Sequence, residues 1–158
     1  QKLNKLSKIY TLPLALHSFI NEMKQQYTMD ITHQNCKPIF HHQFALSKLK
    51  EEGYKLAVAS NSVRNSVKVM MDKSCLDEYL EFFLSNQDVK NAKPDPEIYN
   101  TAIQKLGLTA EECVIVEDNE NGLKAAYASG AHVLKVDAIH DVNYDNITTF
   151  IKEVEGEA

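Results

Sequence analysis

The chain has 158 residues, of which 44% are hydrophobic and 25% charged, the composition of an ordinary globular domain. Its net charge of −5 and its lack of any Lys/Arg run argue against a nucleic-acid surface. No apolar run approaches the roughly 20 residues of a membrane span. The three cysteines form no C-x-x-C pair, which favours reduced thiols in a cytoplasmic protein over disulfides or a zinc site.

The first forty residues predict a helical segment followed by an irregular one. Apolar residues recur at helical spacing over residues 6–27, and Pro13 is expected to split or kink that helix. Residues 28–40 are polar and are expected to be irregular. The next helix is expected over residues 41–52, with Gly53 at its end.

From residue 41 onward, helical patterns alternate with short apolar runs. The predicted strands are residues 54–60, 81–85, 113–118 and 131–137, and the predicted helices after them are residues 61–76, 95–106, 120–129 and 146–154. Asp95 and Pro96 suit a helix start, and Gly107 suits a helix end. This alternation predicts an α/β fold, a Rossmann-like three-layer sandwich whose parallel sheet is covered on both faces.

Polar residues follow the predicted strands where such sheets bind ligands, outside the carboxyl ends. Ser60 and Asn61 follow the first strand, Lys93 precedes a helix, and the pair Glu117-Asp118 ends the third strand. Hydroxyls and free amides at a helix start bind phosphate oxygens, and a lysine adds a positive charge. Adjacent carboxylates suit Mg2+, which takes one or two protein carboxylates besides water and phosphate. Together these residues predict a site for phosphoryl transfer.

Each of these residues also has a simpler interpretation. Ser60 and Asn61 are ordinary helix caps, and a single lysine such as Lys93 is most often a surface residue. The acidic pair could be no more than a polar strand end, with Asp118 or Asn119 capping the next helix. The order and spacing of all the motifs favour the functional interpretation.

The segments "VASNS" (58–62), "KPDP" (93–96) and "VEDNENGLKAAYASGA" (116–131) resemble, in this order, the haloacid-dehalogenase-like (HAD) superfamily. The resemblance covers about residues 41–140 and is closest to the β-phosphoglucomutase-like phosphatase branch. It implies that Ser60 and Asn61 bind phosphate and that Lys93 is the motif lysine. It further implies that Asp118 and Glu117 hold Mg2+, which favours a phosphatase over a dehalogenase. Residues 1–38 are then the C-terminal part of a helical cap, and residues 39–158 form the core.

The family's nucleophile and general acid lie in an Asp-x-Asp motif on the first strand, and this sequence has no Asp-x-Asp. In the family this strand is central, between the strands that here end at Ser60 and Asp118. Because neighbouring strands lie about 4.8 Å apart, its absence predicts a gap of about 10 Å. Each buried backbone group left unpaired there costs on the order of 1–3 kcal/mol. We therefore expect an upstream segment, a separate N-terminal fragment or a second copy to supply the strand.

The resemblance implies a Mg2+-dependent phosphatase of small, sugar-phosphate-like metabolites that works through an aspartyl-phosphate. The expected nucleophile lies upstream, so these 158 residues alone are predicted to have no turnover. Two alternatives stay open, a phosphosugar mutase of the β-phosphoglucomutase type and a non-catalytic module or inactive fragment that only binds phosphate. The substrate is not predicted, because the cap largely sets specificity in this branch.

Overall fold

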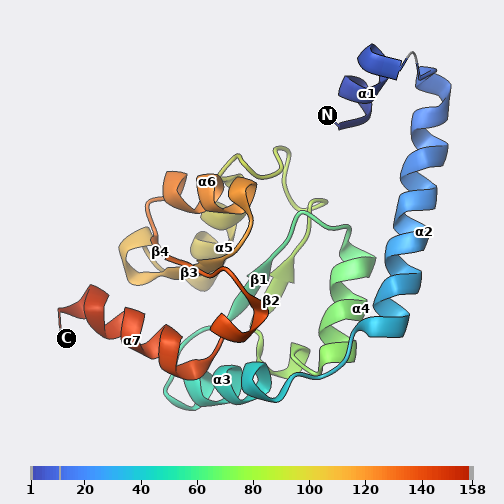
Figure 1. The fold of residues 1–158 in the computed structure, drawn as a ribbon. Helices are drawn as coiled ribbons and strands as arrows, with labels where there is room; N and C mark the ends of the chain where they lie inside the picture. Colours follow the sequence, from blue (N-terminus) through green and yellow to red (C-terminus); the bar gives the residue numbers. More distant parts are fainter. Residues whose placement is uncertain (1, 11, 157–158) are drawn as a thin grey trace. The chain divides into compact units, whose positions relative to one another are not determined.

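A computed structural model describes residues 2–10 and 12–156 of the chain. The chain divides into two compact units, Gln1–Cys36 and Lys37–Ala158, and each is described by itself (Figure 1). Within the described residues, no helix has the length and apolar character needed to cross a membrane.

The first unit is helical throughout most of its length. It contains α1 (Lys2–Tyr10), a 3-10 turn η1 (Leu14–Leu16) and α2 (His17–Asn35). The break predicted at Pro13 is confirmed, because Pro13 lies between α1 and η1 with an extended ψ of 134°. The prediction that residues 28–40 are irregular is wrong for the first eight of them, since α2 continues to Asn35. No glycine or proline occurs between residues 28 and 37, so nothing in the sequence ends the helix earlier.

The second unit alternates helices and strands as predicted. Its main elements are α3 (Phe40–Glu51), β1 (Ala57–Ala59), α4 (Arg64–Ser74), β2 (Phe82–Leu84), α5 (Glu97–Leu106), β3 (Val114–Glu117), α6 (Glu120–Ala128), β4 (His132–Lys135) and α7 (Tyr144–Glu155). Short 3-10 turns lie at η2 (Asp77–Tyr79), η3 (Ala110–Glu112) and η4 (Ile139–Asp141). Gly53 and Gly107 follow α3 and α5 with φ of 93° and 70°, the left-handed conformation that glycine adopts without strain.

The strands form two separate parallel pairs. Val58 of β1 lies opposite Phe83 of β2, and Val116 of β3 lies opposite Leu134 of β4. Within the described residues β1 pairs only with β2 and β3 only with β4. The strands are therefore parallel as predicted, and they are interrupted between β1 and β3, where the sequence predicts a gap.

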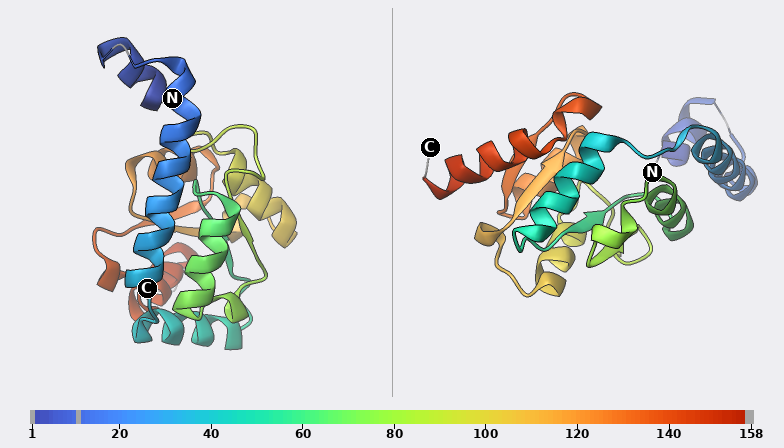
Figure 2. Two further views of the ribbon diagram at one scale, coloured as in Figure 1. Left: turned by 90° about the vertical axis from the view of Figure 1, so that its right-hand side faces the viewer. Right: turned by 90° about the horizontal axis from the view of Figure 1, so that it is seen from below.

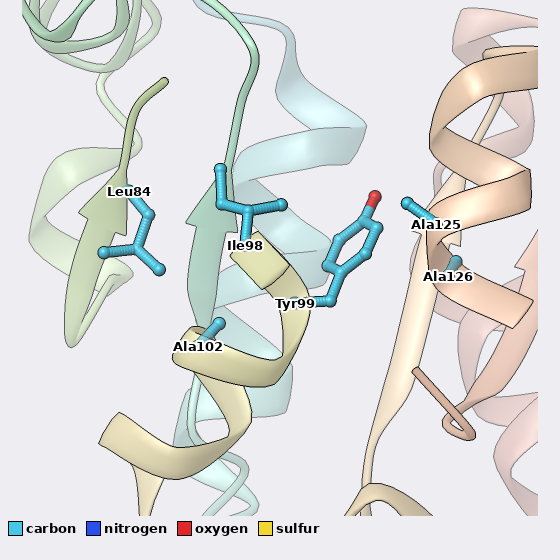
Figure 3. Packing of buried hydrophobic residues seen from close by; sticks show 6 residues of the cluster. All are labelled: Leu84, Ile98, Tyr99, Ala102, Ala125 and Ala126. Carbon is cyan, nitrogen blue, oxygen red and sulfur yellow. The ribbon is translucent and has the colours of Figure 1, made fainter. Parts of the chain in front are cut away.

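Helices cover both faces of the strands and give three layers, which confirms the α/β sandwich. Helices α5 and α6 lie on one face, and α3 and α7 pack together on the other (Figures 1 and 2). The first face holds the buried cluster of Leu84, Ile98, Tyr99, Ala102, Ala125 and Ala126, in which the side chain of Tyr99 lies between Ile98 and the two alanines of α6 (Figure 3). The second face holds Leu49, Ile147 and Ile151. Small alanine side chains let α5 and α6 approach closely.

Candidate functional site

The ammonium group of Lys93 lies between the carboxyl ends of β1 and β3. Its Nζ is 3.0 Å from the backbone oxygen of Ala59, 2.6 Å from the hydroxyl oxygen of Tyr99 and 2.8 Å from Oε2 of Glu117. The side chain is only 8% exposed. Lys93 is therefore a buried cation with fixed partners and not a surface lysine.

Glu117, the last residue of β3, uses both carboxylate oxygens in hydrogen bonds. Oε2 accepts from Lys93 and from the Tyr99 hydroxyl at 2.6 Å, while Oε1 accepts from the backbone N–H groups of Asp118 and Asn119 at 3.1 and 3.0 Å. Burial by itself would raise the pKa of Glu117. The hydrogen bonds from Lys93, Tyr99 and Asn119 and the charge of Lys93 outweigh burial and lower that pKa to about 2.

Tyr99 completes this group, and the sequence analysis did not identify it. It lies in the first turn of α5, where its ring is buried and its hydroxyl reaches both Lys93 and Glu117. The Lys93 nitrogen also lies 4.3 Å from the ring centroid. Burial, followed by the hydrogen bond to Glu117, raises the pKa of Tyr99 and keeps the phenol protonated. A tyrosine on the inward face of a helix next to Lys93 was the available signal.

Gly122 provides the space that the Glu117 side chain occupies. It lies in α6, and a Cβ built on it would be 2.1 Å from both Cδ and Oε2 of Glu117. Real Cβ atoms are not found so close to another heavy atom. Gly122, four residues after Asp118, therefore lets the carboxylate of Glu117 lie against the start of α6.

Ser60 and Asn61 connect the end of β1 to the Lys93 loop and to the start of α4. The Asn61 side chain donates to the backbone oxygen of Lys93 at 3.2 Å and accepts from its backbone N–H at 3.0 Å. The hydroxyl oxygen of Ser60 accepts from the backbone N–H of Ser62 at 3.1 Å. This contact orients the hydroxyl and leaves its own proton available to an anion.

A second acidic residue, Asp88, organises the loop that follows β2. Its Oδ2 accepts from the backbone N–H and the hydroxyl of Ser85 at 2.8 and 2.7 Å, and its Oδ1 accepts from Arg64 of α4. The Ser85 hydroxyl is the main cause that lowers the pKa of Asp88. Glu97 accepts from the backbone N–H groups of Lys90 and Asn91, both at 2.8 Å, farther along the same loop. These bonds fix the loop that carries Lys93.

Asp118 is the acid whose side chain is exposed at this edge. The helix cap considered in the sequence analysis belongs to Asn119, whose side chain accepts from the N–H of Asn121 at 3.0 Å. The residues that the structure describes contain no cluster of three or more His, Cys, Asp or Glu side chains arranged to hold a metal ion. One exposed carboxylate still fits Mg2+, which completes its shell with water and phosphate oxygens. Both carboxylate oxygens of Glu117 already accept hydrogen bonds. Glu117 is therefore better suited to supporting a Mg2+ site than to coordinating the ion itself.

Known proteins resemble more than half of this chain in sequence. A family model described as haloacid dehalogenase-like hydrolase matches residues 2–136. A haloacid dehalogenase-like hydrolase domain-containing protein of Arabidopsis thaliana is 40% identical over 89 residues, which is 54% of this chain and 28% of that protein. A phosphorylated carbohydrates phosphatase of Thermotoga maritima is 30% identical over 99 residues, or 63% of this chain and 45% of that protein.

A solved structure supports the fold. The crystal structure of a HAD hydrolase of family IA, variant 3, from Entamoeba histolytica has a TM-score of 0.71 at 20% identity, covering 85% of this chain and 70% of that one. This chain spans less than half the length of the two curated relatives. The family model covers most of the described residues, both strand pairs and every motif residue of the site. The chain belongs to the haloacid dehalogenase-like hydrolase family.

Proposed function

We propose that the carboxyl edge of β1 and β3 binds the phosphoryl group of a small phosphorylated metabolite, and that the whole protein is a Mg2+-dependent phosphatase. The observation that carries this proposal is the fixed position of the Lys93 ammonium. Its Nζ lies 3.0 Å from the backbone oxygen of Ala59, at the end of β1, and 2.8 Å from Oε2 of Glu117, at the end of β3. A cation held at the carboxyl ends of parallel strands is well placed to attract a phosphoryl oxygen. The name of the Thermotoga maritima relative supports phosphorylated carbohydrates as the substrate class.

Each site residue has a proposed role. Ser60 donates its hydroxyl proton to a phosphoryl oxygen, and Asn61 holds the backbone of Lys93 in place. Lys93 neutralises charge on the phosphoryl group, while Glu117 and Tyr99 position its ammonium. All three Lys93 protons already have acceptors, so a phosphoryl oxygen would share or displace one of them. Asp118 would hold Mg2+, which supplies neutralisation of the negative charge on the transferring group.

The nucleophile is proposed to come from an Asp-x-Asp segment outside these 158 residues, because none occurs within them. A carboxylate oxygen of its first Asp would attack phosphorus and break the bond to the substrate oxygen. The second Asp would protonate the departing alcohol. Water would then attack the aspartyl-phosphate and release inorganic phosphate. In a mutase, a sugar hydroxyl would take the phosphoryl group in place of water.

A cytoplasmic location stays a prediction from the cysteine pattern.

The first experiment measures the binding of inorganic phosphate to the 158-residue chain by calorimetry, with and without Mg2+. We expect Ser60→Ala and Lys93→Met each to weaken phosphate binding at least tenfold. Lys152→Met, which removes an exposed lysine of α7, is the matched control and should leave binding unchanged. Equal phosphate binding by all of these proteins would contradict the proposed site.

A second measurement tests the proposed origin of the nucleophile, since this chain has no Asp-x-Asp of its own. The chain is incubated with p-nitrophenyl phosphate and Mg2+, and the released nitrophenol is followed. We expect phosphate binding without turnover. Robust Mg2+-dependent turnover by these residues alone would overturn the proposed origin of the nucleophile.

A further inference from the structure

The segment that follows β1 and the segment that follows β2 stay bonded to each other beyond the ends of the strands. The N–H of Ser60 donates to the backbone oxygen of Leu84 at 2.9 Å. Farther along, the N–H of Asn86 donates to the backbone oxygen of Ser62 at 3.1 Å. The first segment carries Ser60 of the proposed phosphate site, and the second continues along the chain to Lys93. The relative position of the two segments therefore sets the geometry of that site.

Helix α4 begins at Arg64 and is capped from the other segment. Val63 precedes the helix and makes no side-chain capping bond. Instead, the backbone N–H of Arg64 donates to Oε1 of Gln87 at 2.8 Å. A helix start that is satisfied by a side chain of another loop keeps its position only while that loop stays in place.

Asp88 ties the same loop to the side chain of Arg64. Its Oδ1 accepts from the Arg64 guanidinium, while Oδ2 accepts from the backbone N–H and the hydroxyl of Ser85. Ser85 is fully buried at the end of β2, whereas the side chain of Arg64 is 53% exposed. Asp88 thus holds an exposed arginine against a buried anchor. We call Arg64, Gln87 and Asp88 the loop clasp.

The loop clasp is one of two connections between the segments beyond the strands' own bonds. The other is Asn61, whose side chain bonds to the backbone N–H and C=O of Lys93 at 3.0 and 3.2 Å. Between Asp88 and Lys93, Glu97 accepts from two backbone N–H groups of the loop. Asp88 and Lys93 therefore belong to one ordered piece of chain, and a shift at Asp88 reaches Lys93. A misplacement of about 1 Å is enough to weaken a site that depends on exact positioning.

We propose that Asp88 and Arg64 are positioning residues of the phosphate site. Through the loop clasp they set the separation of the Ser60 hydroxyl and the Lys93 ammonium. This inference rests on the proposed function and deepens it. The competing role is purely electrostatic, since an exposed arginine attracts an anion and a carboxylate repels one. The two roles predict opposite effects of removing the carboxylate.

Calorimetry with inorganic phosphate and the 158-residue chain distinguishes the two roles. Asp88→Asn removes a negative charge at nearly constant side-chain size, so an electrostatic role predicts unchanged or tighter phosphate binding. The positioning role predicts at least fivefold weaker binding, because an amide does not hold a guanidinium as a carboxylate does. Glu120→Gln is the matched control, because Glu120 also forms an exposed ion pair, with Lys124 of α6 at 2.6 Å. It should change phosphate binding by less than twofold.

A double variant tests whether Arg64 and Asp88 act as one unit. Arg64→Ala should weaken phosphate binding about as much as Asp88→Asn does. Arg64→Ala combined with Asp88→Ala should bind like Arg64→Ala alone, because the loop clasp is already broken in the single variant. A double variant that differs from Arg64→Ala by more than threefold in either direction would overturn the inference, as would wild-type affinity in Asp88→Asn.

Hydrogen exchange without phosphate separates this inference from the proposed function. In Asp88→Asn the amides of Arg64, Asn86 and Lys93 should exchange at least tenfold faster, although none of them donates to Asp88. The amide of Ile103, inside α5, is the reference and should be unchanged. Unchanged exchange at all three amides would overturn the inference. Faster exchange together with no phosphate binding by the wild type would leave the loop clasp standing and count against the proposed function.

Discussion

The carboxyl edge of β1 and β3 differs from the cavity between the same two strands in how polar groups are satisfied. At the edge, the side chains of Lys93, Glu117 and Tyr99 bond to one another across the space between the strands. In the cavity, short apolar side chains cannot do this, and the backbone edges of the strands border an apolar volume. Long polar side chains can therefore bridge two strand pairs at their ends, whereas the short apolar side chains between the strands cannot.

The largest effect is expected from removing the cation at the edge. Lys93→Met leaves Glu117, which is 11% exposed, as a nearly buried charge without its partner. Breaking such a pair costs several kcal/mol, so the free energy of unfolding should fall by about 3 kcal/mol. Urea denaturation of the 158-residue chain measures this change.

A double variant is the control for that prediction. Adding Glu117→Gln to Lys93→Met removes the unpaired charge and should restore more than about 1 kcal/mol of the lost stability. If both variants are equally unstable, the pair is not coupled as the structure indicates. In that case the edge would not bridge the strand pairs through this ion pair.

The next effect is a loss of stability in acid. Glu117 has a pKa of about 2 in the folded chain and an ordinary value of 4.5. Its contribution is therefore fully present above pH 4.5 and is lost as pH falls from 4.5 to about 2. We expect this loss to be on the order of 2 kcal/mol for Glu117, measured as the difference between the wild type and Glu117→Gln.

Tyr99→Phe sharpens this measurement. The variant removes one hydrogen bond that lowers the pKa of Glu117, so the acid-dependent loss should shrink while the neutral-pH fold is kept. An unchanged acid profile in Tyr99→Phe would show that the phenol does not stabilise the carboxylate.

A smaller effect is expected from filling the space beside Glu117. Gly122→Ala places a Cβ 2.1 Å from the carboxylate, which must move away from Lys93 and Tyr99. Overpacking of this kind costs about 1–3 kcal/mol, and the better helix propensity of alanine offsets up to about 1 kcal/mol. We expect the free energy of unfolding, measured by thermal denaturation, to fall by about 1 kcal/mol. Asn121→Ala, at an exposed neighbouring position of α6, should change stability by less.

The smallest effect concerns the link between the end of β1 and the Lys93 loop. Asn61→Ala removes two hydrogen bonds to the backbone of Lys93. Because Asn61 is exposed, water replaces part of what is lost, and stability should fall by about 0.5–1 kcal/mol. Phosphate binding should weaken more than stability suggests, because the loop is less well positioned. A variant with unchanged phosphate affinity would show that Asn61 has no positioning role.

Much of the fold follows from local pattern. The alternation of apolar strands and amphipathic helices, with Gly53 and Gly107 at helix ends, predicts the second unit closely. Residues 28–35 are polar, which predicts irregular structure, but they contain no helix breaker and belong to α2. Polar composition alone does not end a helix when every residue can still form its backbone hydrogen bond to the residue four positions earlier.

The sequence by itself determined the α/β class, the order of the motifs and the family resemblance, because these depend on periodicity and on spacing along the chain. Tertiary structure alone decided that Tyr99 joins Lys93 and Glu117, that Gly122 makes room for that carboxylate, and that Glu117 is fully engaged while Asp118 is exposed. It also decided which backbone edges of β1 and β3 face the cavity between these strands. These features depend on distances between segments remote in sequence, which packing sets and a single-chain pattern does not encode.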